Sequence, residues 1–113
     1  MIYYSYLKKF IYLLNKVKGD LNELNDNIKE EKMKCIIFKC SNLVTNISNR
    51  INKMIEEDNY SYLILFEINK NFISLRSYLI EVYNENINLN INKIIRTCLI
   101  NVDICVDTIK KFQ

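Results

Sequence analysis

Apolar residues in the segment 91–112 recur at alternating intervals of four and three residues. The series is Ile91, Ile95, Cys98, Val102, Cys105, Ile109 and Phe112. Helical residues three or four apart lie above one another, so this spacing puts the whole series on one side of an α-helix. A β-strand would alternate with a period of two. The pattern therefore predicts an amphipathic helix whose apolar stripe must be covered by other helices.

Three further segments carry the same alternation and predict helices over about 2–24, 30–57 and 61–83. No single one of them can be stable in water, because each leaves one apolar side uncovered. Their expected core positions are Leu7, Phe10, Leu14, Val17, Leu21 and Leu24, then Ile36, Cys40, Leu43, Val44, Ile47, Ile51, Met54 and Ile55, then Leu65, Ile68, Phe72, Leu75, Leu79 and Val82.

The breaks between these segments are short and polar. The first connection covers 25–31, and the last covers 84–90, where Asn88 or Asn90 is the expected N-cap of the following helix. Gly19 lies inside the first apolar stripe, where a glycine allows a bend or an early end of the helix.

Four amphipathic helices with short connections predict an all-α fold, an up-down-up-down antiparallel four-helix bundle. The 113 residues suffice for a single domain, 1–113, with one core. The chain has no proline and one glycine, which disfavours a turn-rich β fold. Both termini are expected at the same end of the bundle.

The net charge of +3 is small, but the charges are unevenly distributed. The stretches 1–18 and 32–55 contain basic residues and no acidic ones. The second predicted helix carries a line at intervals of seven residues, and an arginine one turn from its last member: Lys32, Lys39, Asn46, Lys53 and Arg50. The sequence therefore predicts a basic ridge along this helix.

Such a ridge suits an anionic partner, and nucleic acid is the first candidate because lysine and arginine neutralise phosphates. The alternative is a solvated helix face without a partner. The predicted nucleic-acid-binding residues are Lys32, Lys39, Arg50 and Lys53, joined by Lys8, Lys9 and Lys16. The first helix also has more tyrosines than one core face can hold, and these either stack on bases or pack against a neighbouring helix or subunit: Tyr3, Tyr4, Tyr6 and Tyr12.

A second line on the third predicted helix consists of residues seven apart: Tyr62, Asn69, Arg76 and Tyr83. Packing against the second helix is the first expectation for this line. Contact with another subunit or with a polar ligand remains open.

The sequence lacks the residues of most enzyme classes. Without histidine there is no Ser-His or Cys-His nucleophile, and no ExxH motif of a di-iron bundle. A single glycine excludes the phosphate-binding loops. No apolar run approaches the length of about 20 residues that spans a bilayer, and the N-terminus does not resemble a secretory signal. We therefore expect a cytoplasmic protein that is not an enzyme and has no cofactor.

Four cysteines occur, at positions 35, 40, 98 and 105. Metal sites favour CxxC pairs, often with histidine, and this chain has neither. Cys98 and Cys105 are too far apart along one helix to form a disulfide. We expect reduced thiols that act as small core hydrophobes, with a redox or metal role as the alternative.

Two segments, IKEEKMKCIIFKCSNLVTNISNRINK and LILFEINKNFISLRSYLIEVYNENINLNINKII, resemble a family of small four-helix bundles. These are the accessory variability determinants of diversity-generating retroelements, with relatives encoded in rRNA intervening sequences. The resemblance implies a homo-oligomeric ring whose basic surface binds a reverse transcriptase and its template nucleic acid. RNA is expected in preference to DNA. The positions that the resemblance implies for this surface are Lys32, Lys39, Arg50 and Lys53, joined by Lys8, Lys9 and Lys16, while Arg76 matches a mid-helix arginine.

A small helical inhibitor, immunity protein or antitoxin that binds one protein partner is the alternative from another functional class. A helical subunit of a larger ribonucleoprotein is a third. Nucleic-acid binding that weakens steeply with added salt would indicate the nucleic-acid-binding accessory factor. Salt-insensitive binding to one protein would indicate the inhibitor.

From the ridge alone we expect Lys39→Glu combined with Lys53→Glu to leave helicity intact and to abolish nucleic-acid binding, because two cations become two anions. Circular dichroism and a gel shift measure the two effects. Unchanged affinity of the double variant would remove the ridge as a binding site.

Overall fold

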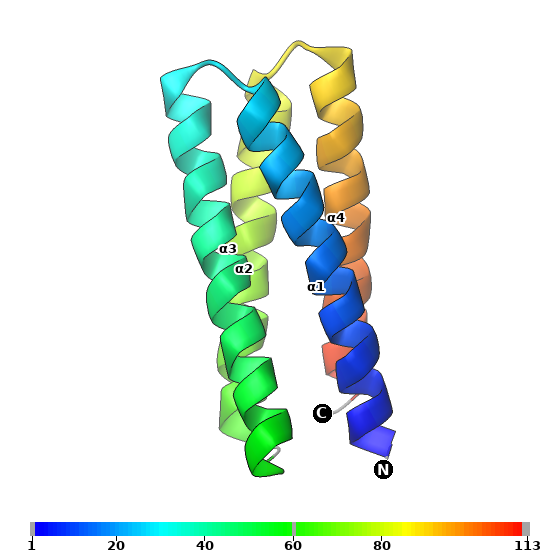
Figure 1. The fold of residues 1–113 in the computed structure, drawn as a ribbon. Helices are drawn as coiled ribbons and strands as arrows, with labels where there is room; N and C mark the ends of the chain where they lie inside the picture. The colour runs from blue at the N-terminus through cyan, green and yellow to red at the C-terminus, as the bar shows by residue number, and fades with distance from the viewer. Residues whose placement is uncertain (1, 60, 112–113) are drawn as a thin grey trace.

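The computed structural model describes residues 2–59 and 61–111, and the side chains of this range from residue 5 onward. Its four helices are α1 (Ile2–Asn27), α2 (Glu31–Glu57), α3 (Tyr62–Glu85) and α4 (Leu89–Lys110). Each helix packs against its neighbour along the chain, and α1 closes the bundle against α4. The predicted antiparallel four-helix bundle is confirmed, and both ends of the chain lie at the same end of it (Figure 1).

The helix ends follow from local hydrogen bonding. The Glu30 carboxylate accepts bonds from the first free N–H groups of α2, so this residue is the N-cap and not the first helical residue. The Asn88 side chain does the same for α4, which decides between the two expected caps. α2 ends at Glu57, and its C-cap Asp58 has a left-handed backbone (φ 50°) and donates its N–H to the last turn of the helix.

The core lies where the four stripes meet. Every expected core position of α1 and α3 is buried, and on α4 this holds for all but Phe112, which lies outside the described residues. The rings of Phe10 and Phe72 meet edge to face across the bundle, with centroids 5.4 Å apart. Within the described part of the chain, no helix is both long and apolar enough to cross a bilayer.

Some core positions differ from the expected ones. Leu43 and Ile55 are only half-buried, because they flank the stripe of α2. Leu13, Ile28 and Ile37 are buried although the alternation did not select them. Leu13 and Ile37 stand next to a stripe, and Ile28 folds in at the turn after α1.

Gly19 does not interrupt helix α1. α1 continues through it for two further turns, and a methyl group in place of its hydrogen would meet no atom within 4 Å. The bend or early end that the glycine allows does not occur, because the buried stripe on both sides of it keeps the helix in place.

Gly19→Ala should therefore raise the free energy of unfolding by about 0.5–1 kcal/mol, since alanine restricts the unfolded chain and nothing opposes it in the folded one. Thermal denaturation followed by circular dichroism measures the gain. Gly19→Pro is the opposite control and should destabilise by about 3 kcal/mol, because proline breaks the helix. A lower melting temperature for the alanine variant would contradict a helix that continues through residue 19 with room for a methyl group.

Candidate functional site

The basic ridge of α2 lies along the seam with α3. Lys32 Nζ is 3.3 Å from a carboxylate oxygen of Glu85, and Arg50 Nη1 is 3.1 Å from one of Glu67. Lys39 Nζ lies 5.7 Å from the centre of the Tyr78 ring, a cation–π contact. Three of the four predicted ridge cations thus engage α3. An anion binding here must compete with two carboxylates for the cations it needs.

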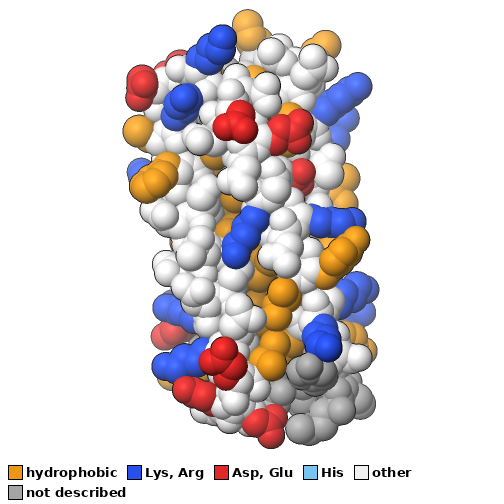
Figure 2. Space-filling model, in the orientation of Figure 1, with side chains coloured by type: hydrophobic (Ala, Val, Ile, Leu, Met, Phe, Trp, Pro, Cys, Tyr) orange, Lys and Arg blue, Asp and Glu red, His pale blue; other side chains and the backbone are white. Residues whose placement is uncertain are grey.

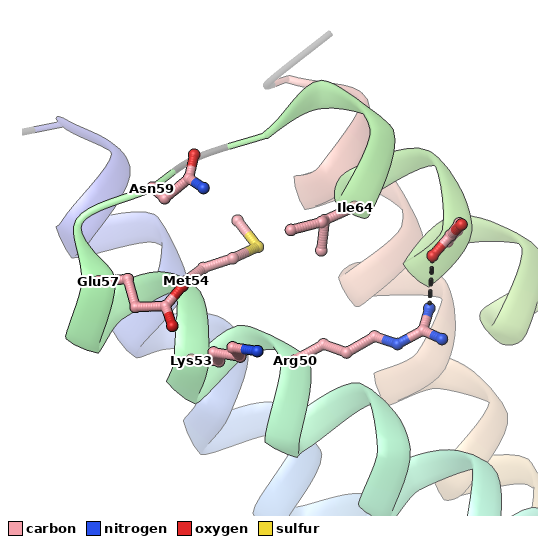
Figure 3. A pocket seen from close by; sticks show the side chains of 7 residues that line it. Arg50, Lys53, Met54, Glu57, Asn59 and Ile64 are labelled. Carbon is pink, nitrogen blue, oxygen red and sulfur yellow. Dashed lines mark hydrogen bonds and ion pairs between the residues drawn. The ribbon is translucent and has the colours of Figure 1, made fainter.

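A small cavity opens at the end of this seam where α2 leads into α3 (Figure 3). Its volume is about 260 Å³, below the roughly 300–1,000 Å³ usual for small-molecule sites. Arg50 and Lys53 face Glu57 and Glu67 around it, so the charges balance. Apolar side chains complete the wall. A charge-balanced, shallow hollow of this size is a poor phosphate site.

The predicted basic residues of α1 lie on another edge. Lys16 is near Asp20, whose carboxylate is close enough to the Cys98 thiol of α4 to raise its pKa, so Lys16 is on the α4 side of its helix. Partial burial raises the pKa of Asp20, Glu23 raises it further, and Lys16 opposes both. Figure 2 shows basic side chains on both sides of the visible face, separated by others. The seven predicted residues therefore do not form one surface.

The antiparallel fold brings two further lysines to the N-terminal half of α1. α4 ends at Lys110, and Lys111 follows, beside the start of α1 (Figure 1). We call the exposed lysines of residues 2–18 and of the C-terminal end of α4 the terminal basic surface; they are Lys8, Lys9, Lys16, Lys110 and Lys111. The sequence pattern did not indicate the last two, which are about a hundred residues away from Lys8 and Lys9 along the chain. The predicted position of both termini at one end was the signal that could have revealed them.

Charged side chains are unevenly distributed over the molecule. Residues 2–18 and 104–111 contain six of the sixteen basic side chains and one of the thirteen acidic ones, Asp107. Ten basic and twelve acidic residues remain for the rest of the chain. The net positive charge of the protein therefore comes entirely from this end of α1 and α4.

An aromatic residue interrupts the lysines of α1. Tyr12 is 59% exposed and lies between Lys9 and Lys16, whose ammonium group is 4.8 Å from the centre of the Tyr12 ring. Tyr6 is exposed as well and stands one turn before Lys9. The side chains of Tyr3 and Tyr4 lie outside the described residues. The described tyrosines are thus surface residues of α1 and not core residues.

The second line of α3 packs against α4. Arg76 Nε donates to the Asp103 carboxylate at 2.9 Å, and Arg96 Nη2 of α4 donates to the Tyr83 hydroxyl at 3.0 Å. The expectation that this line packs on the second helix is therefore wrong. Asn69, also on this line, has a buried amide oxygen without a hydrogen-bond partner, while Tyr62 is exposed.

Three of the four cysteines are buried, and all four are free thiols. Burial raises the pKa of Cys40 and of Cys105 to about 12. Burial also raises the pKa of Cys98 strongly, with a further contribution from the Asp20 carboxylate. Among the described side chains, no three His, Cys, Asp or Glu residues gather where they could hold a metal ion. The buried thiols pack as neutral core groups.

Comparison with known proteins adds no relative. Family models, curated proteins and solved structures were each searched, and none of the three searches found a match to this chain.

In the native protein we expect one thiol, Cys35, to react with a disulfide reagent at pH 8, since it alone is exposed. The other three should react only after unfolding, because they are buried and stay protonated. Absorbance of the released thiolate before and after denaturant counts them. Cys35→Ser is the control and should remove the native reaction. A second fast thiol would contradict the sealed core.

Proposed function

We propose that this protein is a non-catalytic nucleic-acid-binding protein whose contact region is the terminal basic surface. One observation carries the proposal: the excess of positive charge comes from residues 2–18 of α1 and residues 104–111 at the end of α4, which lie beside each other. Confined charge of one sign raises the local potential and attracts a polyanion, whereas scattered charge of mixed sign does not. Lysines then bind phosphates without reading sequence.

Tyr12 favours single strands. Lys9 and Lys16 are two helical turns apart, roughly 10 Å along the axis, and the exposed ring of Tyr12 lies between them. The Lys16 ammonium group lies over one face of this ring, so in this proposal a base stacks on the other face while its flanking phosphates bind the two lysines. Only unpaired bases offer a free face, so single-stranded RNA is the first candidate and duplex DNA is not.

The α2 ridge has a secondary part in this proposal. Lys32 and Arg50 are held by carboxylates of α3, and an incoming phosphate would have to displace them. Lys53 makes no ion pair within the described residues. We therefore assign it at most one phosphate contact.

A protein-binding role is the second candidate. Its specific support is a set of apolar side chains that remain largely exposed, including Phe38, 65% exposed on α2. A protein inhibitor needs such a surface and no basic one. The reverse transcriptase that the family resemblance implies as partner rests on that resemblance alone, and it belongs to this second candidate as well.

Binding of a fluorescent single-stranded 20-nucleotide RNA, measured by anisotropy across a salt series, tests the first candidate. Lys9→Gln with Lys16→Gln should lower the slope of log affinity against log salt by about 1.4, since each lost phosphate contact removes about 0.7. Lys39→Gln with Lys53→Gln removes the same charge from the ridge and should change the slope by at most half as much, in contrast to the loss of binding expected from the ridge alone.

Lys29→Gln with Lys93→Gln, at the far end of the bundle, is the matched control and should bind as the unaltered protein does. Tyr12→Ala should weaken binding with the salt slope preserved, because stacking is not ionic. Equal losses in all three lysine pairs would show attraction by net charge alone. Absence of RNA binding at 50 mM salt would remove the first candidate.

A further inference from the structure

α3 is apolar on two sides. Its core stripe is fully covered, yet Leu63, Phe66 and Ile73 lie on the opposite side and are exposed, Leu63 to 65% and Ile73 to 57%. Ile80 continues the same line and is half-buried. Together with Lys70 and Ser77 these residues form the outer face of α3, which points away from the other three helices. A helix that needed only its own bundle would carry polar residues there.

The outer face carries complementary charges at its two ends. Lys70 lies in the N-terminal half and contacts only the Phe66 ring among the described partners, at 5.1 Å. Glu81 lies in the C-terminal half and, among the described residues, forms no ion pair. Both side chains are exposed and stand on the flank of this face that is nearer to α2. One helix thus holds a cation and an anion that do not meet within the chain.

We propose that the outer face of α3 pairs with the same face of a second copy, antiparallel about a two-fold axis, with Lys70 of each chain opposite Glu81 of the other. Two-fold pairing of antiparallel helices brings identical flanks together, so both ion pairs form at once. The axis passes between residues 75 and 76, close to the middle of α3.

This register covers the apolar residues. Ile73 comes to lie between Ser77 and Ile80 of the second copy, where the small serine leaves room for it. In an antiparallel pair, the position seven residues before Lys70 lies opposite the position seven residues after Glu81. Leu63 therefore lies opposite position 88 of the other chain. The turn that carries Ile87, 96% exposed, then runs beside Leu63 and Phe66 of the second copy. Ile87, the most exposed of the large apolar side chains that the structure describes, thereby obtains a neighbour.

That turn is rigid enough to take part. The Asn86 amide donates to the Asn92 side chain at 3.1 Å, and the Asn92 amide donates to the Asn86 backbone carbonyl at 3.0 Å. Asn86 also bonds to the carbonyl of Asn88. Because the backbone is held by these bonds, little conformational freedom is lost when Ile87 is covered.

Charge reversal tests the pairing and its register. Sedimentation equilibrium of the full chain should give a dimer for the unaltered protein. Lys70→Glu and Glu81→Lys should each raise the dimer Kd by about tenfold or more, because like charges then face each other twice. The double variant Lys70→Glu with Glu81→Lys should recover the original Kd. An equimolar mixture of the two single variants should form a heterodimer, since both of its ion pairs are then attractive.

Ile73→Glu should give a monomer, because it puts a carboxylate at the centre of the apolar contact. Phe38→Glu, an equally exposed apolar residue on α2, is the matched control and should leave the dimer intact. Circular dichroism confirms that each variant folds. A monomeric unaltered protein would overturn the proposal, and so would a dimer that the Lys70 and Glu81 variants do not affect. RNA binding is measured separately, so the two proposals fail independently.

Discussion

Covering four apolar stripes at once is the constraint from which the rest of this structure follows. Each helix has one continuous buried side, and no helix can leave the bundle without exposing it. Closure through α1 and α4 leaves none of the four stripes at an open edge. The same closure brings the two chain ends together, so the terminal basic surface is a consequence of core packing.

The handedness of the bundle is a separate matter from its core. Four antiparallel helices can be arranged so that α2 lies to either side of α1, and both arrangements bury the same stripes. Cross-helix pairs distinguish them: Arg50 with Glu67, Lys32 with Glu85, and Arg76 with Asp103. In the opposite arrangement the flank of α3 that bears Arg76 would face α2 and lose Asp103. Exposed pairs of this kind add little stability, yet three together favour one arrangement over its alternative.

This separation explains what the sequence alone could predict. Periodicity determines which side of a helix is buried, and every predicted position of the α3 stripe is buried in the structure. Periodicity says nothing of which neighbour lies beside each flank. The sequence therefore indicated which residues form the basic ridge of α2 and the second line of α3. It could not indicate which helix lies next to either of them. Lys110 and Lys111 were missed for a related reason, since their place beside the start of α1 follows from the antiparallel fold and not from a line of residues along one helix.

Once the flanks are occupied by these pairs, the outer faces of the four helices are left for function. Two of them, at diagonally opposite corners, have distinct chemistry: α1 is basic with exposed tyrosines, and α3 is apolar with one cation and one anion. Pairing through α3 would leave both α1 faces pointing outward, on opposite sides of the dimer. When one strand is bound at the first of two such sites, its effective concentration at the second site is set by the length of strand between them. Under the two proposals taken together, a dimer of this shape would favour an RNA long enough to reach around two bundles, and a short strand would gain nothing from dimerisation.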